Sequence, residues 1–254
     1  MKNTKTYSLL VLGGTSSIGL SCARRRLITL LERNYKVKIT LLGRDSDKLN
    51  TAKTELAALG ANVLTIMGDL SLLHTIATIH DQLNIIDEAI LTYGSLTNQQ
   101  KAQTDSIYLE KQLTTNFLSA AVWLEKITEK FEQQGYGNAI IIGSVAGDRG
   151  RQSNYIYGAA KAGLETYIEG LQHRVSKQKD INIVLVKPGF VKSPMTAHIM
   201  PKSTLLWAEP VNIAVAAEKA VLRGKHKVYA PWFWWWIMKI IRFMPEFIFH
   251  RTRL

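Results

Sequence analysis

The sequence predicts a single α/β domain in which helices cover both faces of a doubly wound parallel sheet. Three observations lead to this fold class. Short apolar runs alternate with helix-length amphipathic segments, a glycine-rich turn follows the first run, and no linker, repeat or low-complexity segment divides the chain. At 254 residues the chain is near the upper limit for one hydrophobic core. We therefore expect residues 1–230 to form the domain and residues 231–254 to form a C-terminal extension.

The predicted elements follow the apolar pattern in order along the chain. About seven strands are expected, at residues 7–12, 37–42, 63–67, 89–92, 139–143, 181–186 and 227–230. Helices are expected between them, at residues 17–33, 45–59, 105–134, 157–176 and 208–222. Gly60 and Gly135 follow two of these helices, where glycine commonly ends a helix. This strand–helix alternation builds a parallel sheet.

The turn after the first predicted strand reads Gly13-Gly14-Thr15-Ser16-Ser17-Ile18-Gly19. Gly13 permits a tight turn, and Gly19 lets the following helix lie close to the strand. Hydroxyl and main-chain N–H groups of residues 15–17 can bind a pyrophosphate at the start of the helix. The turn predicts a Rossmann-type dinucleotide site; the alternative is a glycine-rich turn that binds no ligand.

A second motif consists of Ser144, Tyr157 and Lys161. Tyr157 and Lys161 are four residues apart in a predicted helix, so their side chains share one face. A neighbouring ammonium favours the phenolate and lowers the phenol pKa from its usual value of about 10. Ser144 supplies a neutral donor to the same oxygen. Behind a dinucleotide turn, these groups predict hydride transfer to a carbonyl; the alternative is a plain amphipathic helix.

Charge and cysteine content limit the classes of function. The formal net charge is +12, and residues 219–254 hold eight basic residues against one acidic residue. The same segment contains most of the tryptophans, which favours a membrane surface over nucleic acid. The one cysteine, Cys22, excludes a disulfide within the chain and is compatible with a reducing compartment. No Cys/His/carboxylate cluster indicates a metal site.

The segment from Pro231 to Met244 is unusually aromatic and apolar. Tryptophan favours the headgroup region of a bilayer, and Lys239 and Arg242 are three residues apart and can extend toward that region. We expect an amphipathic aromatic helix on an anionic membrane surface; the alternative is a buried helix at an oligomer interface. No run reaches the roughly 20 apolar residues that a spanning helix needs.

Over nearly its whole length the chain resembles the classical short-chain dehydrogenases/reductases. The resemblance implies that Asn116 holds a proton-relay water beside Ser144, Tyr157 and Lys161. It also implies that five further residues contact the dinucleotide: Asp69, Pro188, Gly189, Val191 and Ser193. Two departures affect the cofactor site. Ser17 replaces the family's middle glycine, and Leu91-Thr92-Tyr93-Gly94 replaces Asn-Asn-Ala-Gly.

A narrower resemblance concerns the phosphate loop, the residues around Tyr157 and Pro188, residues 224–231 and the basic aromatic tail. These segments resemble the reductase component of decaprenylphosphoryl-ribose 2-epimerase. This resemblance implies a lipid-linked 2-keto pentose as substrate and a flavin-dependent oxidase as partner. We also expect a homo-oligomer.

The choice between NAD and NADP depends on the end of the second predicted strand. An NAD enzyme places a carboxylate there to bind the ribose 2′-hydroxyl, but this chain has Gly43 followed by Arg44. A guanidinium is a good partner for a 2′-phosphate, so the sequence favours NADP(H). The alternatives are that Arg44 is an exposed surface residue, or that Asp45 restores NAD binding.

Three more residues are candidates for substrate contact. Arg149 and Arg151 lie in the loop between Ser144 and Tyr157 and could bind a phosphodiester, although a solvated turn or a subunit contact is an equal alternative. His198 lies in the segment expected to cover the substrate, where a structural role is the alternative.

The sequence therefore predicts an NADP(H)-dependent keto-reductase, cytoplasmic and peripheral on the membrane, that acts on a lipid-linked or other amphiphilic carbonyl. Two alternatives remain open. One is a soluble reductase of a small ketone, such as a 3-oxoacyl thioester or a steroid. The other is a nucleotide-sensing scaffold protein, although such a protein has no need of an acid at Tyr157.

Overall fold

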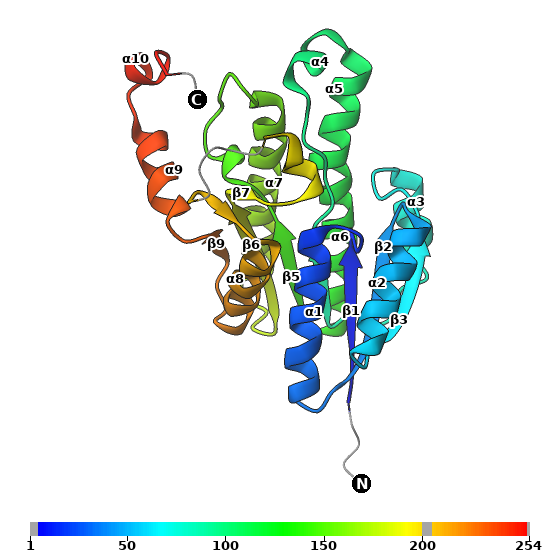
Figure 1. Cartoon of the computed structure of the whole chain (residues 1–254). Coiled ribbons are helices and arrows are strands. Elements are labelled where there is room, and N and C mark those ends of the chain that lie inside the picture. Colours follow the sequence, from blue (N-terminus) through cyan, green and yellow to red (C-terminus); the bar gives the residue numbers. More distant parts are fainter. Residues whose placement is uncertain (1–4, 200–204, 253–254) are drawn as a thin grey trace.

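The computed structural model describes residues 5–199 and 205–252 and contains a seven-stranded sheet in the order β3-β2-β1-β4-β5-β6-β9 (Figure 1). Every neighbouring pair in this sheet is parallel. The strands are β1 (Thr6–Leu12), β2 (Lys36–Gly43), β3 (Asn62–Met67), β4 (Glu88–Leu91), β5 (Gly137–Ile142), β6 (Ile181–Pro188) and β9 (Lys227–Ala230). The predicted doubly wound α/β fold is confirmed.

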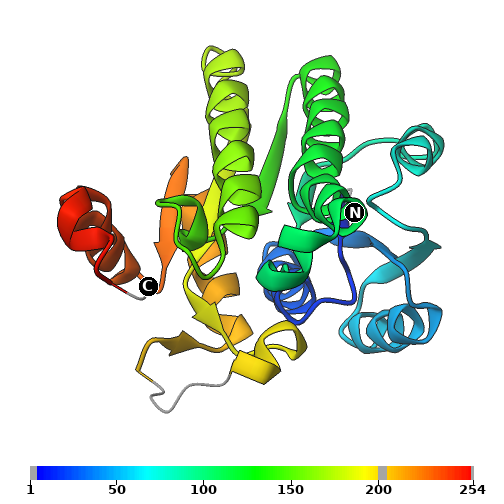
Figure 2. The same cartoon turned by 90° about the horizontal axis from the view of Figure 1, so that it is seen from above.

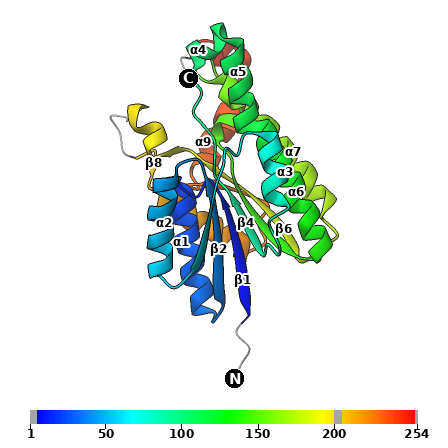
Figure 3. The ribbon, with the colours of Figure 1, turned by 90° about the vertical axis from the view of Figure 1, so that its right-hand side faces the viewer.

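Helices cover both faces of the sheet, as the side view in Figure 3 shows. One face carries α1 (Ser17–Glu32), α2 (Ser46–Ala58) and α8 (Pro210–Leu222). The other carries α3 (Leu73–His80), α6 (Ser119–Gln134) and α7 (Tyr155–Arg174). Each layer packs its own apolar core against the sheet, and Cys22 lies buried in the first core as a free thiol.

The segment before α6 differs from its prediction. The expected helix at residues 105–134 is interrupted, because α5 (Ser106–Leu113) and α6 are joined by a π-helical turn, Thr114–Leu118. Two short helices were not predicted, α3 and α4 (Gln99–Thr104). For α3 the reason is local, since no side chain caps its N-terminus and the sequence gives no start signal.

The C-terminal third adds a small second sheet and two tail helices. β7 (Phe190–Val191) pairs in parallel with β8 (Trp207–Ala208), and a 3-10 helix, Pro194–Ile199, follows β7. Beyond β9 lie α9 (Trp234–Phe243) and α10 (Glu246–Phe249), which stand at the edge of the domain in the view from above (Figure 2). In the described part of the chain, no helix is both long and apolar enough to cross a membrane.

A buried ion pair fixes α1 to the middle of the sheet. Arg26 on α1 donates to both carboxylate oxygens of Glu88 on β4 at 2.7 Å, and Tyr7 Oη donates to Glu88 at 3.1 Å. Arg26 and Glu88 are almost completely buried, so each charge depends on the other for its compensation. Because β1 has β2 on one side and β4 on the other, the strand order reverses here, and sheets of this kind have their ligand crevice at the carboxyl ends of these strands.

Candidate active site

The glycine-rich turn lies at this crevice and packs directly on the end of β4. Gly13 has a φ of +92°, and a Cβ atom there would lie 2.8 Å from the main-chain nitrogen of Tyr93. A Cβ atom on Gly19 would lie 2.6 Å from the carbonyl oxygen of Gly13. Ser16 caps α1, since its Oγ accepts from the N–H of Gly19 at 2.9 Å. The turn is therefore held in one conformation before any ligand binds.

Thr92, one of the departures from the family pattern, supports this turn. Its Oγ1 lies 3.0 Å from Ser16 Oγ and donates to the carbonyl oxygens of Leu12 and Gly13 at 3.2 Å. The threonine hydroxyl thus joins the ends of β1 and β4 at the base of the turn. Sequence reasoning treated this position only as a departure from the family's asparagine.

The residues fit a dinucleotide. Among the described residues, the main-chain N–H groups of Ser17 and Ile18 have no hydrogen-bond acceptor, as is usual for the first turn of a helix. Such groups bind phosphate oxygens. At the end of β2, a Cβ atom on Gly43 would lie 3.2 Å from the methyl group of Thr15, so glycine leaves the turn accessible there.

Asp45 is occupied as a helix cap and not as a ribose ligand. Its Oδ1 accepts from the N–H of Lys48 at 3.1 Å, and its Oδ2 pairs with the Lys48 ammonium at 2.9 Å. Arg44 beside it is exposed. Partial burial of Asp69 is outweighed by hydrogen bonds from Ser71 and by the charge of Arg44, so the pKa of Asp69 is below its usual value.

The catalytic candidates come from two elements that touch each other. Ser144 follows β5 and caps the 3-10 turn Val145–Gly147 by accepting from the N–H of Ala146 at 3.1 Å. Tyr157 and Lys161 lie in the first turns of α7. The Nζ atom of Lys161 is 5.9 Å from the centre of the Tyr157 ring and donates to the carbonyl oxygen of Ile142 at 3.3 Å.

Two glycines make this contact possible. A Cβ atom on Gly147 would lie 2.9 Å from the main-chain nitrogen of Ala162, and one on Gly158 would lie 2.8 Å from the carbonyl oxygen of Ala146. These distances are shorter than the contacts that real Cβ atoms make. A larger residue at either position would therefore separate α7 from the loop after β5 that carries Ser144, which we call the serine loop. The close approach of the serine loop to α7 brings the Ser144 hydroxyl near the Tyr157 phenol.

Asn116 approaches the same place from the π-helical turn. Its Nδ2 donates to the carbonyl oxygen of Gln112 at 3.0 Å, and its Oδ1 accepts from the N–H of Ser95 at 3.0 Å. A Cβ atom on Gly94 would lie 2.9 Å from Asn116 Oδ1 and 3.8 Å from Lys161 Nζ. The structure therefore brings the asparagine and the lysine to one point, and the irregular helical turn lies at this functional position.

The electrostatics of the pair differ from the expectation that Lys161 lowers the pKa of Tyr157. Burial raises the pKa of the Tyr157 phenol to about 12, with a smaller opposing effect from its hydrogen bond with Ser144. Burial also lowers the pKa of Lys161 to about 8. The reason is geometric: the ammonium lies beside the ring and donates to the main chain at Ile142. Near neutral pH the Tyr157 phenol therefore keeps its proton, and the Lys161 ammonium loses its proton more readily than an exposed lysine does.

Of the candidates after β6, Gly189 lies against the C-terminal tail. A Cβ atom on Gly189 would lie 1.9 Å from the indole of Trp234, so only glycine fits beneath this tryptophan. Val191 is buried in β7. The Ser193 hydroxyl lies 3.2 Å from Thr196 Oγ1. From the sequence we favoured a membrane surface for the tryptophans, with a buried helix at an oligomer interface as the alternative. Packing of Trp234 on Gly189 of the same domain was not foreseen.

Arg149 has a different role from the substrate contact that we expected. Its Nη1 donates to the carbonyl oxygens of Ile241 at 2.5 Å and Met244 at 2.6 Å, and its guanidinium stacks on Phe249 at 3.8 Å. It caps the C-terminus of α9, where the helix dipole favours a cation. These contacts could not be foreseen from local sequence because the partners are 92 residues or more away.

Arg151 borders a cleft of about 410 Å³ whose other walls include Tyr155, Phe249 and His250. Its Nε has no partner among the described residues, and burial lowers its pKa. His198 lies in the 3-10 helix Pro194–Ile199, but its side chain is outside the described part of the structure.

Known proteins share this sequence pattern and this fold. The family described as short chain dehydrogenase matches residues 8–204. An uncharacterized oxidoreductase in the mprA 5′ region of Streptomyces coelicolor is 31% identical over 251 residues, covering 96% of this chain and 95% of the relative.

Solved structures agree in fold. A short-chain dehydrogenase from Sphingobium yanoikuyae in complex with NADPH has a TM-score of 0.79 at 21% identity, covering 97% of this chain and 96% of that one. A 3-oxoacyl-[acyl-carrier protein] reductase from Brucella melitensis in complex with NAD has a TM-score of 0.74 at 20% identity, covering 88% and 94%.

The lowered pKa of Lys161 predicts how stability depends on pH. The folded pKa is about 8 and the ordinary value is 10.5, so between these values the unfolded chain binds more protons than the folded one. The free energy of unfolding of wild type, relative to Lys161→Met, should therefore rise as pH increases from 8 to 10.5. Urea unfolding of both proteins without cofactor measures this difference, and a difference that stays constant would contradict the burial effect.

Proposed function

The chain belongs to the short-chain dehydrogenase family, and from its site we propose that it reduces a ketone to a secondary alcohol with NADP(H). One observation carries the proposal: the serine loop, the first turns of α7 and the π-helical turn bring Ser144, Tyr157, Lys161 and Asn116 to the crevice that also holds the glycine-rich turn. Family membership supports NAD(P)-dependent oxidoreductase activity in general. The direction, the cofactor and the substrate are proposals from this chain's residues.

Each of the four catalytic candidates has its own role in the proposed reduction of the carbonyl group. When bound, the nicotinamide supplies the hydride for the carbonyl carbon. Ser144 donates a hydrogen bond that orients the carbonyl oxygen, and Tyr157 transfers its proton to that oxygen. A phenol with a pKa of about 12 remains protonated at neutral pH and is available as the acid. Lys161, with a pKa of about 8, can return a proton because its own pKa is near the operating pH, and Asn116 holds the relay beside it.

Removing the phenol hydroxyl tests the acid. Tyr157→Phe should lower kcat by about 10²-fold or more, because general acid catalysis commonly contributes 10²–10⁴-fold. NADPH affinity should change little, since only the proton donor is lost. Steady-state kinetics and a fluorescence titration measure the two effects.

Tyr155→Phe is the matched control, because this exposed tyrosine lies two residues earlier on the same helix and bonds only Gln103. It should retain wild-type kcat. A Tyr157→Phe enzyme with more than about a tenth of the wild-type rate would rule out Tyr157 as the acid.

NADP(H) is proposed over NAD(H) because of three neighbouring positions. Gly43 provides no carboxylate for a ribose 2′-hydroxyl, Asp45 is engaged with Lys48, and Arg44 is exposed beside them. A guanidinium there can pair with a 2′-phosphate. NAD binding through a shifted Asp45 loop is the competing outcome.

Replacing the arginine tests this choice. Arg44→Ala should weaken NADPH binding by about tenfold, the loss of one charge-assisted hydrogen bond, and leave NADH binding nearly unchanged. Lys53→Ala is the control, since it removes an exposed positive charge from α2 away from the end of β2. Equal losses for both cofactors would show that Arg44 does not contact the phosphate.

A lipid-linked keto sugar at the membrane surface is the substrate class that we propose, of the decaprenylphosphoryl-2-keto-erythro-pentose type. The support comes from the tail, whose two faces differ. Trp234, Met238 and Ile241 are buried against the domain. Five large apolar residues of the outer face are each more than half exposed: Trp232, Trp236, Ile240, Phe243 and Phe247. Lys239 and Arg242 accompany them, which fits an anionic bilayer.

Changing only the outer face tests this proposal. The variant Trp236→Ser, Ile240→Ser, Phe247→Ser should lose binding to anionic vesicles, since apolar burial supplies most of the attraction. Its activity on a water-soluble ketone should persist, because the inner face is intact. Vesicle flotation and light scattering measure binding and subunit state.

The matched control is Met67→Ser, Ile85→Ser, Ile107→Ser, which removes three exposed apolar residues from other parts of the surface. This control should float like wild type. Wild-type protein that does not float, or a tail variant that dissociates into smaller species, would favour a subunit interface at this face.

A further inference from the structure

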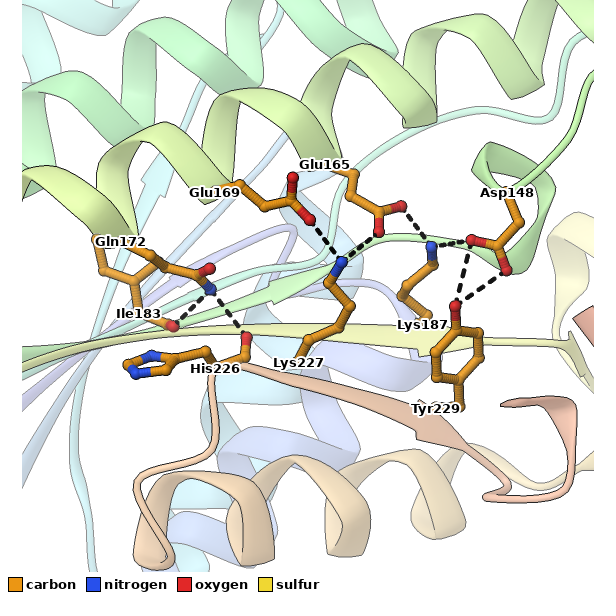
Figure 4. Close-up of polar contacts among 9 residues, drawn as sticks. All are labelled: Asp148, Glu165, Glu169, Gln172, Ile183, Lys187, His226, Lys227 and Tyr229. Carbon is orange, nitrogen blue, oxygen red and sulfur yellow. Dashed lines mark hydrogen bonds and ion pairs between the residues drawn. The ribbon is translucent and has the colours of Figure 1, made fainter. Parts of the chain in front are cut away.

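Lys187 is a completely buried lysine that the proposed chemistry does not use. It lies on β6 directly before Pro188 and Gly189, and its side chain is 0% exposed. Its ammonium donates to Oδ1 of Asp148 and to Oε2 of Glu165 (Figure 4). A buried ammonium is retained only where it is paired, and here two carboxylates hold it.

Each of these carboxylates has a second partner. Tyr229 Oη donates to Oδ2 of Asp148 at 3.1 Å, and Lys227 pairs with Glu165 at 2.8 Å. Figure 4 shows the resulting chain of contacts from Lys227 through Glu165 and Lys187 to Asp148 and Tyr229. We refer to these five residues as the Lys187 cluster.

The cluster joins the elements that carry the active site. Asp148 is four residues after Ser144 and ends the 3-10 turn that Ser144 begins. Glu165 is four residues after Lys161 on α7, so the two side chains share one face of that helix. Lys187 itself precedes the Pro188-Gly189 corner. One ammonium thus links the serine loop, the tyrosine–lysine helix and the strand beside the nicotinamide site.

The tail helix covers the cluster at its Asp148 end. Asp148 and Tyr229 line a cavity of about 200 Å³ whose other walls, among them Met238 and Arg242, come from α9. The next residue, Arg149, caps this same helix. The side chains of Lys187 and Asp148 are only 1% and 3% exposed, so little water reaches this ion pair.

We propose that Lys187 is a positioning residue for the reduction, which fixes the serine loop against α7 so that Ser144 and Tyr157 meet the same carbonyl oxygen. This inference rests on the proposed function. Gly147 and Gly158 allow the two elements to approach, but a close approach without a side chain supplies little attraction. The ion pairs of Lys187 supply that attraction from the β6 side.

Lys187→Met tests the role, because methionine is also unbranched and removes only the charge. Its kcat should fall by about tenfold or more, as a small displacement of a catalytic group costs up to about 10²-fold. The KM for NADPH should change by less than about threefold, since the ion pairs of Lys187 reach Asp148 and Glu165 and no residue of the glycine-rich turn. Lys227→Met is the matched control. It also removes an ammonium from Glu165 but has no contact with the serine loop, and it should keep wild-type kcat.

A double variant separates positioning from general destabilisation. If Lys187 acts through Ser144, then Lys187→Met should reduce kcat far less in a Ser144→Ala background than in wild type. Independent losses that multiply would overturn the positioning role. So would a folded Lys187→Met protein with kcat within about twofold of wild type.

Hydrogen exchange provides a measurement that does not depend on turnover. Amide exchange at residues 144–148 should increase in Lys187→Met and stay unchanged in Lys227→Met. If Lys187→Met does not fold, Asp148→Asn replaces it, since asparagine keeps the shape and still accepts from Tyr229. Unchanged exchange would overturn the proposal. Increased exchange together with wild-type protein that reduces no ketone would overturn the proposed function and leave intact only the inference that Lys187 holds the serine loop against α7.

Discussion

The active site depends on a contact in which the loop after β5 meets α7 main chain to main chain. Gly147 and Gly158 form this contact, and neither leaves room for a Cβ atom. Ser144 and Tyr157 belong to different elements, and the proposed reaction requires this contact for both to reach one carbonyl oxygen. On the opposite side Gly94 faces Asn116 and Lys161 with the same lack of space. The geometry of the site therefore depends on the lack of side chains at these glycines as much as on the reactive side chains.

The rest of the fold supplies the forces that hold these close approaches. Arg26 and Glu88 tie α1, and with it the glycine-rich turn, to β4 in the centre of the sheet. Thr92 then joins the ends of β1 and β4. Beside the edge strand β9, Lys187 holds β6 to two carboxylates. Burying the polar groups of these links costs desolvation free energy, and several hydrogen bonds compensate for it. A buried charge that is compensated in this way favours one geometry.

Much of the fold and of the site could be predicted because the relevant signals are local. The strands and α1 follow from apolar runs and from the glycine-rich turn before α1. Tyr157 and Lys161 share a helix face whatever the tertiary arrangement. The π-helical turn at Asn116 could not be predicted, since its periodicity is that of a continuous helix. Trp234 and Arg149 could not be placed either, because their partners lie far away in sequence.

The two faces of the tail explain why its composition alone was ambiguous between a membrane segment and a buried helix. Trp234 closes over Gly189 and Met238 lies at the cavity beside Asp148, so the inner face is part of the domain. Trp236, Ile240 and Phe243 remain exposed on the outer face. Removing the whole tail would therefore uncover Gly189 and deprive Arg149 of its acceptors, and activity would fall whatever the outer face binds. Only substitutions confined to the outer face can distinguish attachment to a bilayer from support of the active site.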